Sequence, residues 1–147
     1  MATYALIDVQ ATIVGPGLAL PIGAGAGLAE EGISIEAVEN VGHMVIGGDG
    51  TPMQVLQSNK GYRVTLHLLK TSPTNAPLMA AQQSQRTTGA LWGRNTFSLT
   101  NMITGDEFSG QAVAFEKTPR IDYDKPGKMV DWTFLVGIGD WIYGASA

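Results

Sequence analysis

The stretch GYRVTLHLLKTSPTNAPLMAAQQSQ, residues Gly61–Gln85, decides how the rest of the chain is interpreted. Its first part alternates between two kinds of side chain. One side holds the apolar residues Tyr62, Val64, Leu66 and Leu68, and the other holds Arg63, Thr65 and His67. A period of two residues predicts a β-strand with one buried face.

The second part of the stretch predicts the one convincing helix of the chain, over about residues 73–86. Ser72 suits the N-cap and Pro73 the first helical position. With Asn75 as the cap, the helix would begin two or three residues later. Pro77 must then lie in the first turn, where its missing N–H costs little. The polar, uncharged residues near the end of the helix suit a surface packed against protein as well as one in water.

Strand and turn signals fill the remaining sequence. The predicted strands are Ala5–Val14, Leu18–Ile22, Ile33–Glu39, Thr96–Thr100, Glu107–Pro119 and Val130–Ile138. In the last two, we expect Val113, Phe115, Trp132, Phe134, Val136 and Ile138 to point inward and Glu116 outward. Gly89–Gly93 predicts a turn with a buried aromatic residue. Because no helix follows each strand, the chain predicts one mainly β domain over residues 1–147: an antiparallel sandwich or small barrel of two packed sheets with one flanking helix.

A projecting hairpin is expected over about residues 41–59. Two short apolar runs, His43–Ile46 and Pro52–Gln57, flank the turn sequence Gly47-Gly48-Asp49-Gly50-Thr51, and Asp-Gly between apolar runs is a strong hairpin signal. Apart from Asp49, no formal charge lies between Val41 and Asn59. Such a hairpin is either a covered sheet edge or a contact arm for another subunit.

Composition narrows the class of protein. The chain has no cysteine, which excludes disulfide scaffolds and thiolate metal sites, and only 15% of its residues are charged. None of its nine bases precedes Lys60, while six of its thirteen acids do, so the net charge is −6 before Lys60 and +2 from Lys60 onward. We expect a protein without a signal peptide or a membrane-spanning segment. Low charge with nineteen glycines suits a surface that neighbouring subunits bury.

No catalytic, cofactor or metal site is predicted. The glycines of the segment Gly23–Leu28 do not have the spacing of a phosphate-binding loop, so we interpret it as a close-packed or flexible loop. The two histidines, His43 and His67, lack metal-ligand spacing. Two alternatives remain: a monomeric β-sandwich that binds carbohydrate or a host surface through Trp92 or Trp141, and a hydrolase with a pair of carboxylates.

Several segments, taken in their order along the chain, resemble those of a family of small bacteriophage structural proteins. This family contains the tail tube proteins of long-tailed and mainly contractile-tailed phages. The resemblance runs through ATYALIDVQATIVGPG, GAGAGLAEEGISIE, LLKTSPTNAPL, ALWG, QAVAFEKTPRIDY and the closing Trp-Thr-Phe strand. It implies rings of six copies whose inner strands join into one barrel, stacked into a hollow tube through which the genome is ejected. It also implies that the protein is assembled in the host cytoplasm and located in the virion.

The same resemblance implies partners and residue roles. The partners would be tail sheath, tape-measure, baseplate and tail-terminator proteins, with DNA passing through the lumen without specific binding. Ser34, Glu36 and Glu39 are candidates for the lumen, where acidic groups repel phosphates. The candidate ring-stacking residues of the hairpin are His43, Met44, Ile46, Asp49, Met53, Val55 and Leu56. The candidate outer contacts of the helix are Gln82, Gln83 and Gln85.

Overall fold

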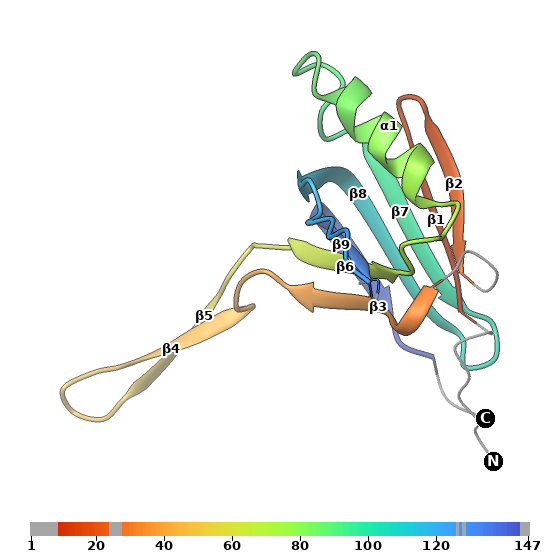
Figure 1. The fold of residues 1–147 in the computed structure, drawn as a ribbon. Helices are drawn as coiled ribbons and strands as arrows, with labels where there is room; N and C mark the ends of the chain where they lie inside the picture. The colour runs from red at the N-terminus through yellow and green to blue at the C-terminus, as the bar shows by residue number, and fades with distance from the viewer. Residues whose placement is uncertain (1–8, 24–27, 126, 128, 145–147) are drawn as a thin grey trace.

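The computed structural model describes residues 9–23, 28–125, 127 and 129–144 as an antiparallel β structure with one helix (Figure 1). Seven strands form one sheet in the order β2-β1-β7-β8-β9-β6-β3. These strands are β1 (Val9–Gly15), β2 (Leu18–Gly23), β3 (Leu28–Ala37), β6 (Tyr62–Leu68), β7 (Asn95–Asn101), β8 (Asp106–Lys117) and β9 (Val130–Ile142). A separate hairpin contains β4 (Gly42–Ile46) and β5 (Pro52–Leu56), and the helix is α1 (Asn75–Gln85). The prediction of a mainly antiparallel β fold with one flanking helix is confirmed.

The two packed layers come from one sheet that curls on itself. Val64, Leu66 and Leu68 of β6 are buried, as their alternation predicts, and inward residues of every other strand of the sheet pack around them. Val9 of β1 and Ile35 of β3 line the same cavity of about 190 Å³, although four strands lie between β1 and β3 in the sheet. The two ends of the sheet therefore approach each other across the core.

A β-bulge reverses the inward-outward alternation near the middle of β8 and β9. Phe97 and Asn95 of β7 pair with Gly110 and Val113 of β8, so β8 has one extra residue at this point. The alternation of β9 changes at the same place, because β9 stays in register with β8 there. Val113, Phe115, Trp132, Phe134 and Val136 are buried as predicted. Ile138 is 49% exposed, so its predicted inward position is wrong.

The helix begins later than the turn sequence predicts. Its first residue is Asn75, and the Ser72 hydroxyl accepts a hydrogen bond from the Thr74 N–H in the turn before it. Ser72 is therefore not the N-cap, and Pro73 lies outside the helix. Pro77 occupies the first turn, as expected.

Polar contacts hold α1 over one end of the core, and they overturn part of the predicted outer surface. Gln82 and Gln85 are 1% and 0% exposed. Gln82 Oε1 accepts a hydrogen bond from the Thr118 hydroxyl at 3.0 Å, and Gln85 exchanges hydrogen bonds of 2.9 and 2.8 Å with the Asn95 amide. The sheet offers polar partners at this end, so these two glutamines face inward. Their predicted role as outer contacts is wrong, and only Gln83 of the three is exposed.

The structure corrects the prediction for the aromatic residue of the Gly89–Gly93 turn. The aromatic residue of the Gly89–Gly93 turn, Trp92, is 37% exposed and rests on Phe115 at a ring-centroid distance of 6.4 Å, so it is not buried. The loop expected at Gly23–Leu28 falls largely on residues 24–27, which lie outside the described residues, as do residues 5–8 of the first predicted strand. Within the described ranges, no helix is long and apolar enough to cross a membrane.

Candidate functional site

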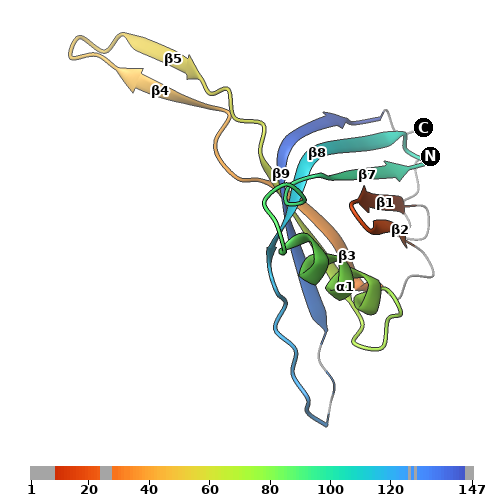
Figure 2. The ribbon, with the colours of Figure 1, turned by 90° about the horizontal axis from the view of Figure 1, so that it is seen from above.

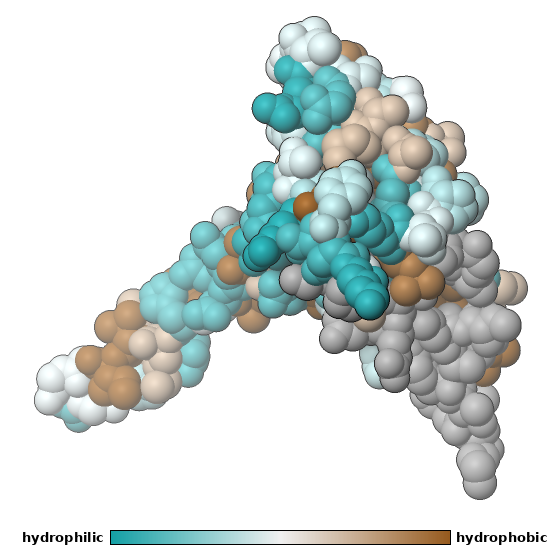
Figure 3. Space-filling model, in the orientation of Figure 1, coloured by the Kyte–Doolittle hydropathy of each residue, from teal (hydrophilic) through white to brown (hydrophobic). Residues whose placement is uncertain are grey.

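The β4–β5 hairpin projects from the curled sheet as an arm with two apolar faces (Figures 1 and 2). Cross-strand pairing places Met44, Ile46, Pro52 and Leu56 on one face, and His43, Val45, Met53 and Val55 on the other. Leu56 is 87% exposed, and the other large apolar side chains are about half exposed except the more covered Val55. Hydrophobic atoms gather along the outer part of the arm (Figure 3). An isolated hairpin is only marginally stable in water, and a contiguous exposed apolar surface is typical of an interaction site.

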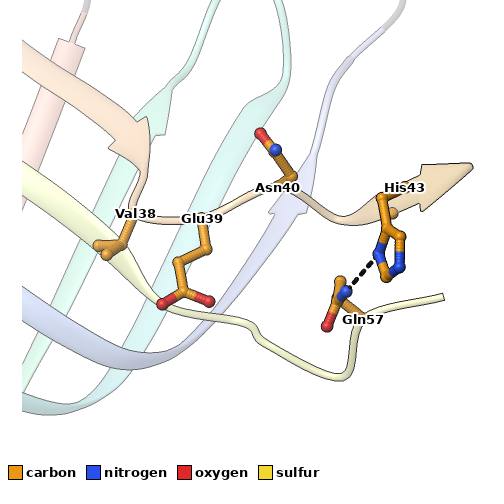
Figure 4. Close-up of a pocket in the computed structure, with 6 residues that line it drawn as sticks. Val38, Glu39, Asn40, His43 and Gln57 are labelled. Atoms are coloured by element: carbon orange, nitrogen blue, oxygen red, sulfur yellow. Dashed lines mark hydrogen bonds between the residues drawn. The ribbon is translucent and has the colours of Figure 1, made fainter. Parts of the chain in front are cut away.

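A polar pocket of about 390 Å³ lies where the arm leaves the sheet (Figure 4). Glu39, Asn40, His43 and Gln57 line it with two small neighbours. The Gln57 amide lies 2.6 Å from Nδ1 of His43, which ties the two strands of the arm together at its base. Glu39 therefore lies at the base of the arm and not in the strand with Ser34 and Glu36.

Asp49 fixes the turn at the tip of the arm. Its Oδ1 accepts a hydrogen bond from the Thr51 N–H at 3.0 Å, and this bond lowers the pKa of Asp49. Because the folded-state pKa is depressed, the stabilising contribution is present above the ordinary carboxyl pKa. It is lost as the pH falls through the lowered pKa.

We expect the Thr51 amide resonance to shift as the pH falls below the ordinary pKa of an aspartate, since protonation weakens this hydrogen bond. An NMR titration of the amide measures the midpoint. The Asp49→Asn variant is the control and should show no such transition. A midpoint in the wild type above the ordinary aspartate pKa would contradict the assignment.

The outward face of the sheet holds the other candidate residues, Ser34 and Glu36 of β3. Glu36 pairs across the strands with Arg63 of β6, and the two side chains form an ion pair of 3.4 Å. The Arg63 guanidinium also donates two hydrogen bonds, of 2.8 and 3.3 Å, to the carboxylate of Glu116 in β8. Glu116, and after it Glu36, raises the pKa of Arg63. One base is thus neutralised by two acids, and the network keeps a net negative charge.

Removing the Glu116 carboxylate should cost more stability than removing that of Glu36. Glu116→Gln loses a bidentate contact to Arg63, so we expect a measurable loss in the free energy of unfolding. Glu36→Gln loses a longer, single and more exposed contact, so we expect a smaller loss in the free energy of unfolding. Denaturant titration of both variants measures the difference. Equal losses would show that the bidentate geometry adds nothing.

Among the described residues, the sheet ends in two unpaired edges, which are strands β2 and β3. Pro21 lies within β2 and has no N–H, so this edge is partly blocked. On β3, residues Ile33–Ala37 pair regularly with β6 on one side only. Open edges invite pairing with another chain unless a partner covers them.

Sequence reasoning missed an apolar surface at the other end of the sheet. Met102 and Ile103 of the β7–β8 turn are exposed, and they lie near the end of β9, where Trp141 and Tyr143 are exposed as well. The sequence predicts Trp141 as a residue that could bind carbohydrate or a host surface, and it gives no local signal that the β7–β8 turn lies beside it. In the described part of the chain, no three His, Asp or Glu side chains gather as metal ligands would.

Comparison with known proteins identifies the family. The model of the bacteriophage PhiTE tail tube protein family matches residues 1–144. The cap that terminates the tube of the anti-feeding prophage is similar in fold, with a TM-score of 0.54, 10% identity and coverage of 98% of this chain and 95% of that one. The sheath/tube terminator of the PVC extracellular contractile injection system has a TM-score of 0.55, 13% identity and coverage of 97% and 98%. A search of curated proteins found no match. The chain belongs to the bacteriophage PhiTE tail tube protein family, and its role is structural and not enzymatic.

Proposed function

We propose that the protein forms hexameric rings that stack into the hollow tube of a contractile phage tail, through which DNA enters the host. The observation that carries this proposal is one sheet with two open edges beside an arm with two exposed apolar faces. A chain with these features exposes the surfaces for lateral and for axial contacts at the same time. Because the chain belongs to the tail tube family, lateral contacts would build each ring and axial contacts would stack the rings.

Lateral contacts form in this proposal when the β3 edge of one copy meets the next copy in the ring. Joining the sheets of six copies removes the open edges, as closure does in any barrel. The outward faces then line the channel, with Ser34 and Glu36 among the lining residues. Their surroundings support this placement, since Arg63 is offset by two acids and leaves no free positive charge in the network. A channel without free bases lets phosphates slide past.

Axial contacts form when the arm of one copy reaches the next ring, through Met44, Ile46, Met53, Val55 and Leu56. Two different surfaces meet in such a contact, so it repeats without closing and produces a filament. His43 and Asp49 shape the arm at its base and tip. Sheath, tape-measure, baseplate and terminator proteins are the partners that a contractile tail requires.

Electron microscopy of the purified protein tests the proposal. We expect rings or tubes with a central hole and six-fold symmetry. A species of 15.5 kDa at high protein concentration would contradict it. At higher resolution, a tube with Glu36 on its outer wall would contradict the channel assignment alone.

The exposed glutamine of α1, Gln83, remains a candidate for contact with the sheath or a neighbouring copy. Gln83→Lys places a charge on an otherwise uncharged helix surface, and we expect it to reduce the yield of sheathed tubes severalfold. Sedimentation of assemblies formed from the variant and the sheath protein measures this yield. An unchanged yield would mean that this helix surface faces solvent.

A further inference from the structure

An exposed apolar surface lies on the opposite side of the molecule from the arm. We call it the end patch, and it consists of Met102, Ile103, Trp141 and Tyr143, which are between 41% and 83% exposed. In Figures 1 and 2, the arm extends to the left of the curled sheet and the β7–β8 turn lies on its right. Pairing of Phe108 with Trp141, and a 2.8 Å hydrogen bond from the Gly144 N–H to Asp106, hold the turn against the end of β9. The four residues therefore lie near one another at this end of the sheet.

The end patch borders a cavity of about 190 Å³ between the two ends of the curled sheet. Trp141 and Tyr143 belong to its lining, together with Ile33 and Ile35 of β3. This volume is smaller than that of an ordinary ligand site, and it suits one or two side chains of a protein partner. The Trp141 ring is fixed against Phe108 at a centroid distance of 5.1 Å, so the wall of the cavity is already formed.

We infer that the end patch of one copy receives the arm of the next copy. The inference rests on the proposed function and names the receptor of the proposed axial contact. Each of the two surfaces, the end patch and the arm face with Met44, Ile46 and Leu56, exposes on the order of 500 Å². Together they would bury roughly 1,000 Å², which is the size at which a specific interface begins. The unbranched side chain of Met44 suits an irregular cavity.

The positions of the two surfaces favour a second copy as the occupant. A heterologous contact needs two different patches whose repeated pairing does not close, and patches on opposite sides of one chain meet this condition. The arm carries a single acid, Asp49, at its tip, and the acid in the cavity lining, Asp106, accepts a hydrogen bond from the Gly144 N–H. We expect the contact to be insensitive to salt, as apolar contacts are.

Complementation between two variants tests the inference. The arm variant carries Met44→Ser, Ile46→Ser and Leu56→Ser, and the patch variant carries Met102→Ser, Ile103→Ser and Tyr143→Ser. Each alone should form unstacked rings. A mixture should form particles of two rings and no longer filaments, because each pair of variants has one intact arm and one intact patch. Analytical ultracentrifugation and electron microscopy measure the number of stacked rings.

The outcomes separate the inference from the proposed function. Stacking by the patch variant to wild-type tube length would overturn the receptor assignment, even if the arm variant fails to stack. Failure of the mixture to form double rings would also overturn it. Stacking by the arm variant would instead contradict the axial role of the arm. Both variants change exposed residues, and circular dichroism melting within a few degrees of the wild type confirms that they fold. For further support, Ile46→Cys with Ile103→Cys in this cysteine-free chain should give disulfide-linked ladders, and Ile46→Cys with Ser98→Cys should not.

Discussion

Replacing Met44, Ile46 and Leu56 with serine should abolish tube formation and leave the fold intact. These side chains share one face of the β4–β5 arm and are at least half exposed in the single chain. Exposed apolar side chains add little to the stability of the isolated protein, so we expect a melting temperature within a few degrees of the wild type. In the assembly each would lose apolar burial of roughly 1–2 kcal/mol. Three losses at every axial contact weaken association by a factor on the order of a thousand.

The matched control changes three exposed apolar residues outside the arm and the end patch. Leu69→Ser, Ile121→Ser and Met129→Ser have the same chemistry, and these residues are between 39% and 47% exposed. We expect this control to form tubes of normal length. Sedimentation and electron microscopy compare the two variants at equal concentration. Normal tubes from the arm variant would refute the axial role of the arm.

Replacing Gln85 with leucine should cost about 3 kcal/mol in the free energy of unfolding. The Gln85 amide is fully buried, and it bonds both the Asn95 side chain and the Pro16 carbonyl, the latter at 3.1 Å. Leucine would remove the donor to Oδ1 of Asn95 and to the Pro16 carbonyl, and each buried group left unsatisfied costs about 1–3 kcal/mol. A loss of this size is a large share of the ~5–15 kcal/mol that stabilises a typical domain. Denaturant titration at constant pH measures it.

Two comparisons show whether the loss comes from the amide pair. Gln83→Leu, on the exposed side of the same helix, should change stability by less than about 0.5 kcal/mol. In a double-mutant cycle, Gln85→Leu and Asn95→Leu should be less than additive, with a coupling of roughly 1–2 kcal/mol, because each single change already breaks the pair. Full additivity, or a Gln85→Leu loss no larger than that of Gln83→Leu, would contradict this account.

The same amide pair explains a constraint at Gly15. A Cβ added to Gly15 would lie 1.7 Å from Oδ1 of Asn95. Asn95 has no room to move, since it is buried and holds both Gln85 and the Val113 carbonyl at 3.1 Å. The amide pair that holds α1 over the core therefore requires a residue without a side chain at position 15.

Sequence alone determined the features that depend on near neighbours in the chain. The period of two in Tyr62–Leu68 depends only on the pleat of a strand, and β6 follows it. The Asp-Gly turn predicts the β4–β5 hairpin in the same way, because turn geometry is fixed by a few consecutive residues. The collinear resemblance to tail tube proteins also needed no structure, and the family match over residues 1–144 bears it out.

Tertiary structure decided what depends on residues distant in the chain. Ile138 points outward because the bulge between β7 and β8 shifts the alternation of β9, and no local pattern in β9 reveals a bulge elsewhere. Gln82 and Gln85 are buried because Thr118 and Asn95 lie opposite them, although their polarity alone suggested a surface. Met102 and Ile103 join Trp141 and Tyr143 only through the pairing of β8 with β9. Local periodicity reports the backbone conformation, whereas burial and surface composition arise from long-range register, which neighbouring residues do not encode.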